Sequence, residues 1–220
     1  MTLPGVSRHT AQSLLAAIGD ITRFRDADAL ASYLGLVPST RQSASHCYHG
    51  PITKQGRCDT RRMLVQSAHA VRAHPGPLGH FFRRLSKRKP RNVAVIAVAH
   101  KLVLLAWHLL TKGEPYRYAL PQATENKLRK MRVQATGEKR RTGSAPGTKK
   151  SPGRLPGPSH RIKPLPEVYA SEQVPAVRPA PAGELRHLAG LKLNDFVDSL
   201  QQAYVVPVHR PPKENAAKNQ

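Results

Sequence analysis

Apolar residues recur at intervals of three and four through the first 118 residues of this 220-residue chain, which places them on one face of successive α-helices. Residues 11–18 carry four such positions and are followed by Gly19, so they predict a first helix that ends at that glycine. Asp26 is a suitable N-cap for a second, short helix, which Gly35 would end.

Three further helices are predicted over 61–71, 77–85 and 92–110. In the helix over 61–71 the apolar residues share one face, and the arginines are expected to be exposed to solvent. The third is almost wholly apolar, but it contains Lys101 and is too short for a comfortable membrane span, so we expect a central core helix. No segment alternates convincingly between apolar and polar residues, and the fold class is therefore expected to be all-α.

The composition changes after Tyr118, which predicts three parts: a compact domain over 1–118, a basic linker over 119–164 and a tail over 165–220. Within the linker, residues 134–164 are rich in Gly, Pro, Ser, Thr, Lys and Arg. Such a segment buries too little apolar surface to offset the entropy of ordering, so disorder is expected there. In the tail, helical spacing returns near 184–204 and predicts one short helix.

The charge is strongly positive, at +23. Residues 1–118 hold 18 basic and 5 acidic residues, and residues 119–164 hold 12 basic and 2 acidic residues. The tail is neutral, with 6 basic and 6 acidic residues. A chain this basic favours a polyanion as its partner, and nucleic acid is the commonest one. Aromatic residues make up only 5% of the chain, which favours contact with the duplex backbone over base stacking.

The N-terminal sequence and the number of cysteines indicate the cellular compartment. The start, Met-Thr-Leu-Pro-Gly, lacks the layout of a secretory signal, and we expect no membrane association. Cys47 and Cys58 are too few for a disulfide framework. A bacterial cytoplasm, with the protein at the nucleoid, fits this composition.

A first candidate binding motif is the turn Leu3-Pro4-Gly5-Val6-Ser7 in front of the first helix. A Pro-Gly-Val-Gly turn between two short helices is typical of a helix-hairpin-helix, whose backbone N–H groups hold a DNA phosphate without reading sequence. Gly5 and Ser7 are therefore candidate phosphate contacts, with Ser7 at the place of the usual second glycine. The alternative is an ordinary turn before a core helix.

A second candidate is the segment 35–56, which we expect to be a loop. It holds three serines close to Arg41, Lys54 and Arg57. A serine hydroxyl becomes a nucleophile only when a base, a metal or cationic surroundings stabilise its alkoxide, and cations would also neutralise an attacked phosphodiester. The alternative is a solvated, serine-rich linker.

Two other groups of residues invite a functional interpretation. His46, Cys47, His49 and Cys58 are zinc-type ligands, but their layout matches no tight zinc pattern, so no metal site is expected on this chain. A basic cluster made of Arg83-Arg84 and Lys87-Arg88-Lys89 precedes Pro90. Such runs are usually solvated, and beside a DNA-binding domain they would add phosphate contacts.

The ordered run PGV…LLA.IGDI.RF…ALASYLGLVPS.RQS…G.ITK.G…R..LVQ.AHA resembles the C-terminal domain of DEDD-type insertion-sequence transposases related to the Piv DNA invertase. The likeness covers about residues 3–118. Some members of that family are guided by a bridge RNA. The resemblance implies DNA transposition or recombination as the function, with double-stranded DNA as the substrate and a guide RNA as a further expected partner.

In the family, a serine of this domain attacks a DNA phosphodiester and becomes covalently joined to DNA. The family serine lies in an Arg-Gln-Ser-Gly-Gly-Lys-like context, which matches Arg41-Gln42-Ser43-Ala44-Ser45-His46 here. Ser43 is therefore the catalytic candidate, Ser45 the second choice and Ser39 the third. The DNA-binding candidates are as follows: Gly5, Ser7, Arg41, Lys54, Arg57, Arg61 and Arg62.

Family members also have an N-terminal RuvC-like domain, whose four acidic residues bind Mg²⁺. No such segment precedes the turn here, and we interpret Asp20, Asp26, Asp28 and Asp59 as structural. We therefore expect a truncated enzyme or one half of a split one, with Mg²⁺ only on the missing domain and none bound by this chain. A RuvC-like partner chain or a second copy would complete it.

Two rival functions remain open at this point. One is a catalytically inactive DNA- or RNA-binding remnant, and the other is a basic RNA-associated protein unconnected with transposition. The ordered match and the lack of an aromatic RNA-binding platform disfavour the second of these.

Overall fold

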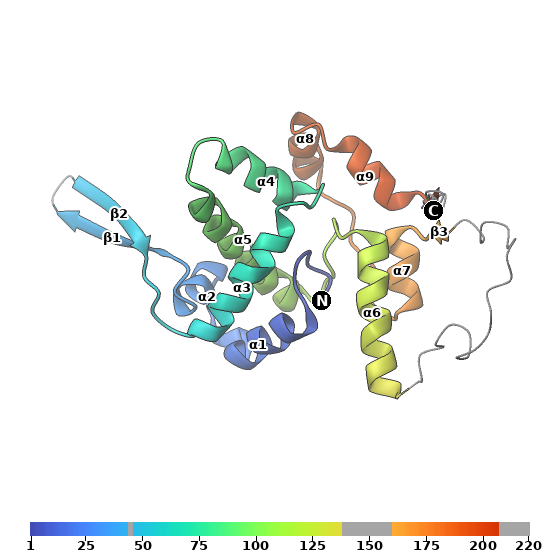
Figure 1. Ribbon diagram of the computed structural model, residues 1–220, viewed down its shortest axis with the longest axis horizontal. Coiled ribbons are helices and arrows are strands. Elements are labelled where there is room, and N and C mark those ends of the chain that lie inside the picture. Colours follow the sequence, from blue (N-terminus) through green and yellow to red (C-terminus); the bar gives the residue numbers. More distant parts are fainter. Residues whose placement is uncertain (44–45, 138–159, 207–220) are drawn as a thin grey trace, which may run out of the picture.

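The computed structural model describes residues 1–43, 46–137 and 160–206, and most of these residues are helical, which confirms the predicted helical fold (Figure 1). The elements follow in this order: α1 (Arg8–Ile18), η1 (Ile21–Arg23), α2 (Ala27–Tyr33), β1 (Pro38–Ser43), β2 (His46–Ile52), α3 (Cys58–Val71), α4 (Pro77–Ser86), α5 (Arg91–Lys112), α6 (Pro121–Thr136), β3 (His160–Ile162), α7 (Leu165–Ser171), α8 (Ala182–Gly190), α9 (Asn194–Gln201) and β4 (Tyr204–Val206).

The first helices begin and end where capping chemistry allows. The Ser7 hydroxyl accepts a hydrogen bond from the Thr10 N–H at the start of α1, at 3.2 Å. At the other end, Gly19 has a φ of 62° and donates its N–H to the Leu15 carbonyl. The Asp26 carboxylate accepts from the Ala29 N–H at 2.7 Å and so caps α2 as predicted.

Helix α5 is the centre of the core. It packs against α2, α3 and α4, and its buried positions are Ala94, Val95, Val98, Ala99, Leu102, Val103 and Ala106. By length and composition alone this helix could cross a membrane, but 39% of its most apolar window is buried inside the protein. Its contacts with three other helices give it the place of a core helix, as the sequence predicts.

One element departs from the expected loop over 35–56. Strands β1 and β2 pair in an antiparallel hairpin that extends away from the helices (Figure 1). Both faces of β1 are exposed except at Ser39, which is half-buried. Alternation of apolar and polar residues arises only where one face of a strand is buried, so this hairpin leaves no such pattern in the sequence.

The part after Tyr118 is more structured than the predicted linker and single tail helix. Helix α6 lies in the segment expected to be linker, and the segment near 184–204 forms two helices separated by a turn at Lys192, whose φ is 57°. Of the residues predicted to be disordered, 138–159 lie outside the described residues. The tail also joins the main hydrophobic core, through Leu165, Tyr169, Leu188, Leu193 and Leu200.

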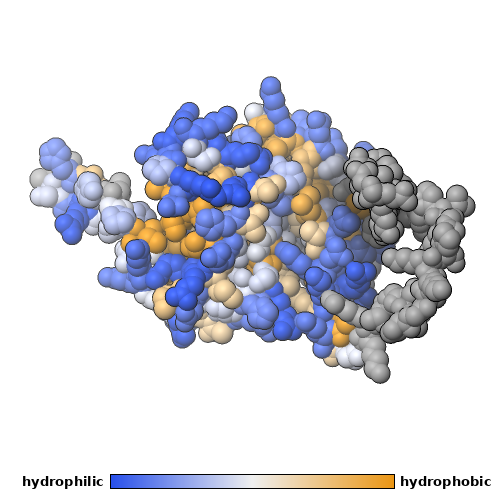
Figure 2. Space-filling model, in the orientation of Figure 1, coloured by the Kyte–Doolittle hydropathy of each residue, from blue (hydrophilic) through white to orange (hydrophobic). Residues whose placement is uncertain are grey.

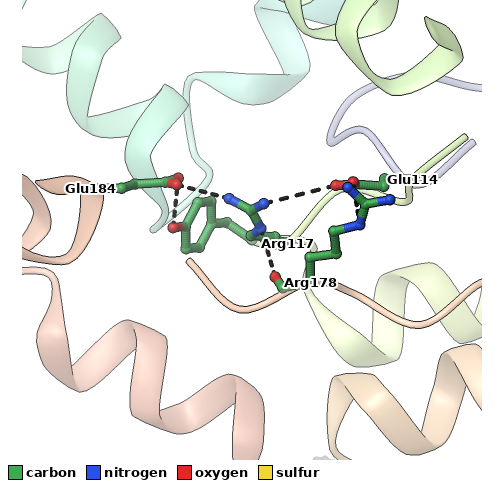
Figure 3. Close-up of polar contacts among 5 residues, drawn as sticks. Glu114, Arg117, Arg178 and Glu184 are labelled. Carbon is green, nitrogen blue, oxygen red and sulfur yellow. Dashed lines mark hydrogen bonds and ion pairs between the residues drawn. The ribbon is translucent and has the colours of Figure 1, made fainter. Parts of the chain in front are cut away.

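A polar clasp ties this tail to the end of α5 and consists of Glu114, Arg117, Tyr118, Arg178 and Glu184 (Figure 3). The Arg117 guanidinium lies 2.8 Å from the Glu184 carboxylate and donates to the Arg178 carbonyl at 2.9 Å. The Tyr118 hydroxyl donates to Glu184 at 2.7 Å, and Arg178 lies 3.0 Å from Glu114. Charge-assisted bonds of this kind hold the tail in one position.

Candidate nucleic-acid interface

Ser43, the predicted nucleophile, is the last residue of β1, at the end of the hairpin that lies away from the helices. Its side chain is exposed, and its partner across the hairpin is His46. Ser45, the second-choice nucleophile, and Ala44 lie outside the described residues. Ser39 is placed near the base instead, where a Cβ on Gly50 would come within 2.5 Å of its hydroxyl oxygen. Ser43 is therefore exposed to solvent at the end of a two-stranded hairpin.

The hairpin register gathers four different side-chain types on one face. Residues two apart on a strand share a face, as do residues directly opposite each other on paired strands. Arg41 pairs with Tyr48 and Ser43 pairs with His46, so this face carries a guanidinium, a phenol ring, a hydroxyl and an imidazole. Tyr48 is 68% exposed, unusual for a large aromatic side chain. The sequence pointed neither to Tyr48 nor to the pairing of His46 with Ser43, because this grouping depends on the strand register.

At the base of the hairpin the two flanking segments are bonded to each other, and one of them lies close against α2. The Thr53 N–H donates to the Val37 carbonyl at 3.0 Å, and the Lys54 N–H donates to the Gly35 carbonyl at 3.2 Å. Gly56 has a φ of 92°, and a Cβ there would lie 2.0 Å from the Tyr33 carbonyl oxygen. Only glycine allows this approach, so the sequence holds the hairpin at one angle to α2.

The predicted cations at this base have unequal surroundings. Lys54 is exposed, and Arg57 hydrogen-bonds the Tyr33 side chain, which lowers the pKa of that phenol. Arg62 is exposed and lies 4.0 Å from Asp59. Arg61, expected in solvent, is instead half-buried and donates to the Leu34 carbonyl at 3.1 Å. The structure therefore shows Arg61 bracing the chain that leads into the hairpin.

Arg23 is a further cation at this base that sequence analysis did not identify. Its guanidinium lies 4.9 Å from the ring centroids of both Phe24 and Tyr33. It also contributes to the lowered pKa of Tyr33, after the hydrogen bond from Arg57. The only sequence signal for this placement is an arginine next to an aromatic residue, which is too common to be specific.

The Gly5 turn lies apart from the hairpin, against α3. Gly5 has a φ of 75°, and a Cβ would lie 2.3 Å from the Ser67 carbonyl oxygen. Ser7 caps α1 through the Thr10 N–H. Both residues thus have structural tasks that account for their identities, and the phosphate contacts assigned to them from the sequence stay predictions.

The acidic residues and thiols of the described segments do not converge. Asp20 accepts from the Thr22 N–H at 2.9 Å, and this hydrogen bonding lowers the pKa of its carboxyl. Cys47 and Cys58 are exposed thiols on β2 and α3. Within the ranges that the structure describes, no three His, Cys, Asp or Glu side chains are grouped as a metal site.

Comparisons with known proteins agree with the family that the sequence resembles. Residues 1–83 match the model of the transposase IS116/IS110/IS902 family. Three similar proteins are the transposase of insertion element IS1111A from Coxiella burnetii, the pilin gene-inverting protein of Moraxella bovis and the transposase of IS1328 from Yersinia enterocolitica.

The identities are 32% over 120 residues, 30% over 118 and 29% over 117, respectively. The matched parts are 53%, 52% and 51% of this chain and 33%, 37% and 35% of the relatives, so the chain spans about a third of the length of the proteins it matches. Over these segments the chain is similar to transposases and to a pilin gene inverter, and its residues 1–83 match the IS116/IS110/IS902 transposase family model.

Proposed function

We propose that this chain acts in DNA transposition or recombination and that Ser43 is the nucleophile that becomes joined to DNA. The observation that carries the proposal is the position of Ser43, exposed at the far end of a basic hairpin inside the segment that matches the family. The names of the relatives, transposases and pilin gene inverters, support the same class of reaction.

The chemistry follows from the face that Ser43 shares with His46 and Arg41. The Ser43 oxygen attacks the phosphorus of a DNA phosphodiester, and the bond from phosphorus to the leaving DNA oxygen breaks. The hydroxyl proton passes to the His46 imidazole, and the leaving oxygen takes up a proton from solvent. Arg41 donates to the phosphoryl oxygens as negative charge grows on them.

The metal and the partners of the reaction belong to this proposal as well. Among the described residues, no carboxylate cluster fits Mg²⁺. We assign Mg²⁺ to a RuvC-like domain, with duplex DNA as the substrate and a guide RNA as a further partner. A RuvC-like chain, or a second copy, would bring its carboxylates to the hairpin.

A second candidate function is nucleic-acid binding without cleavage. It is favoured by the residues after Ser43, where Ala44, Ser45 and His46 stand in place of the Gly-Gly-Lys usual in the family. In that case the basic surfaces would hold DNA or RNA, but no bond to Ser43 would form.

An adduct assay separates the two functions. The chain is combined with a RuvC-like domain from a related element, Mg²⁺, the guide RNA of that element and end-labelled DNA, and a protein–DNA band that survives denaturing gel electrophoresis is measured. Ser43→Ala should abolish this band and leave DNA binding intact, whereas Ser39→Ala, the matched control, should keep both. An adduct that survives Ser43→Ala but not Ser45→Ala would move the nucleophile by two residues.

A further inference from the structure

A groove of about 530 Å³ lies between α4 and the turn that joins α8 to α9. Helix α4 contributes His80, Arg83, Arg84 and Lys87, and the turn contributes Lys192. In Figure 1 this region lies well away from the hairpin, and in Figure 2 the surface over α4 is strongly hydrophilic. The groove is therefore a separate surface from the one assigned to Ser43.

The α4 residues form one continuous basic stripe. They are spaced at i, i+3, i+4 and i+7, which places them on the same face of the helix. Arg83 donates to the His74 carbonyl at 3.1 Å and is thereby held in place, while the Arg84 guanidinium lies 5.9 Å from the Phe81 ring. Among the described residues, no Asp or Glu lines the groove.

The tail completes this surface from far along the sequence. Phe196 packs its ring edge-on against His74, with centroids 5.9 Å apart, and Leu193 is buried. The polar clasp around Glu184 holds the preceding segment. As a result, Lys192 lines the same groove as Arg83, Arg84 and Lys87. Burial, and after it the charges of Arg83, Arg84 and Lys87, lower the pKa of His80.

We propose that this groove is a second nucleic-acid contact, in which α4 and Lys192 bind the phosphate backbone of duplex DNA. Cations gathered without a neighbouring carboxylate are stabilised by an anion that binds among them. The stripe is about 10 Å long at about 1.5 Å per helical residue, and it matches about three phosphates at about 3.4 Å of axis each. The described residues that line the groove include no Phe, Tyr or Trp, which favours a duplex over stacked single strands.

The test compares two triple charge reversals in the full chain. The groove variant carries Arg84→Glu, Lys87→Glu and Lys192→Glu. The control variant carries Lys101→Glu, Lys112→Glu and Lys130→Glu, which are exposed cations elsewhere on the protein. Both lose the same net charge, and circular dichroism with thermal unfolding checks that both fold. Binding of a fluorescent 30-base-pair duplex is then titrated at several salt concentrations.

The groove variant should reduce the slope of log affinity against log salt by roughly 2 to 3, about 0.9 for each lost phosphate contact, and the control by clearly less. If the salt slope fell by the same amount in both variants, the proposal would be overturned, because the change in net charge alone would explain the result. If the groove variant lost more affinity for a single-stranded RNA of equal length than for the duplex, the assignment of duplex DNA would be overturned. The test does not depend on Ser43, since Ser43→Ala should leave this slope unchanged even if no adduct forms.

Discussion

Ser43 and His46 lie directly opposite each other across the β1–β2 hairpin, as the last residue of one strand and the first of the next. Opposite residues on an antiparallel pair have Cβ atoms about 4.5–5.5 Å apart and share a face. The strand pairing thus brings a hydroxyl and an imidazole within reach of each other. The pairing also places Arg41 and Tyr48 on that same face.

His46→Gln tests the proton-accepting role. In the reconstituted adduct assay, the rate should fall by about 100-fold or more, the usual contribution of a positioned general base, while DNA affinity stays constant. Gln42→Asn, on the other face of β1, is the matched control and should keep the rate. If His46→Gln reacts at the normal rate, another group accepts the proton.

Arg41→Gln tests the hairpin as a DNA contact. Loss of one phosphate-contacting cation should weaken binding of different DNA sequences to a similar extent and reduce the salt slope by about 1. Fluorescence titration at several salt concentrations measures both effects. Lys112→Gln removes an equally exposed charge from the end of α5 and should change the slope less. Equal effects of the two substitutions would show that the hairpin makes no specific contact.

Gly56→Ala tests how the hairpin is anchored. The new methyl group would meet the Tyr33 carbonyl oxygen, so the free energy of unfolding should fall by more than about 2 kcal/mol in thermal or denaturant unfolding. Gly113→Ala is the control, since Gly113 also has a positive φ, 64°, but a Cβ there meets nothing within 4 Å. Gly113→Ala should lower the free energy of unfolding by about 1 kcal/mol. Equal costs would mean that the clash is relieved by a small shift.

Glu184→Gln tests the polar clasp. The substitution removes the charge that Arg117 and Tyr118 contact, and it should destabilise the docked tail by about 1–3 kcal/mol. Limited trypsin digestion should then cut sooner at Arg186 and Lys192, two exposed basic residues of the docked tail. Glu167→Gln changes an exposed carboxylate on α7 and should leave the digestion pattern as it is. Unchanged cleavage in Glu184→Gln would show that apolar packing alone holds the tail.

His74 should make stability fall in acid. Burial, followed by the charges of Lys127 and Arg83, lowers the pKa of His74 from 6.5 to about 4. The unfolded chain therefore takes up this proton first, and stability is lost as the pH falls from about 6.5 to about 4, by on the order of 2 to 3 kcal/mol.

Urea unfolding measured over this pH range, on wild type and His74→Asn, checks the prediction for His74. The asparagine keeps an oxygen that can accept from the Gly76 N–H, as the His74 ring nitrogen does at 3.0 Å. The substitution should flatten the acid dependence. If the free energy of unfolding depended on pH in the same way in wild type and His74→Asn, a group other than His74 would be responsible for the acid dependence.

The helices of this protein were predictable because each has a buried stripe. Leu64, Ala68 and Val71 of α3 face the core, and burial of one side is what gives a helix its three- and four-residue spacing. The helix ends at Gly19 and Asp26 were predicted as well, because capping interactions are local, within a few residues. The Ser7 cap is equally local, but Ser7 was predicted as a phosphate contact. The resemblance of the segment around Ser43 to the family rested on an ordered pattern of residues, which is visible without the structure.

The hairpin and the groove were decided by tertiary structure. The exposed strands of the hairpin carry no alternation, and the pairing of Ser43 with His46 exists only through register. Helical spacing predicted one helix near 184–204, where the structure has α8 and α9. Their position against α4 depends on a clasp between residues 67 apart, Arg117 and Glu184. Local sequence determines which segments bury a face, whereas only the packed chain determines which distant charges come to share a surface.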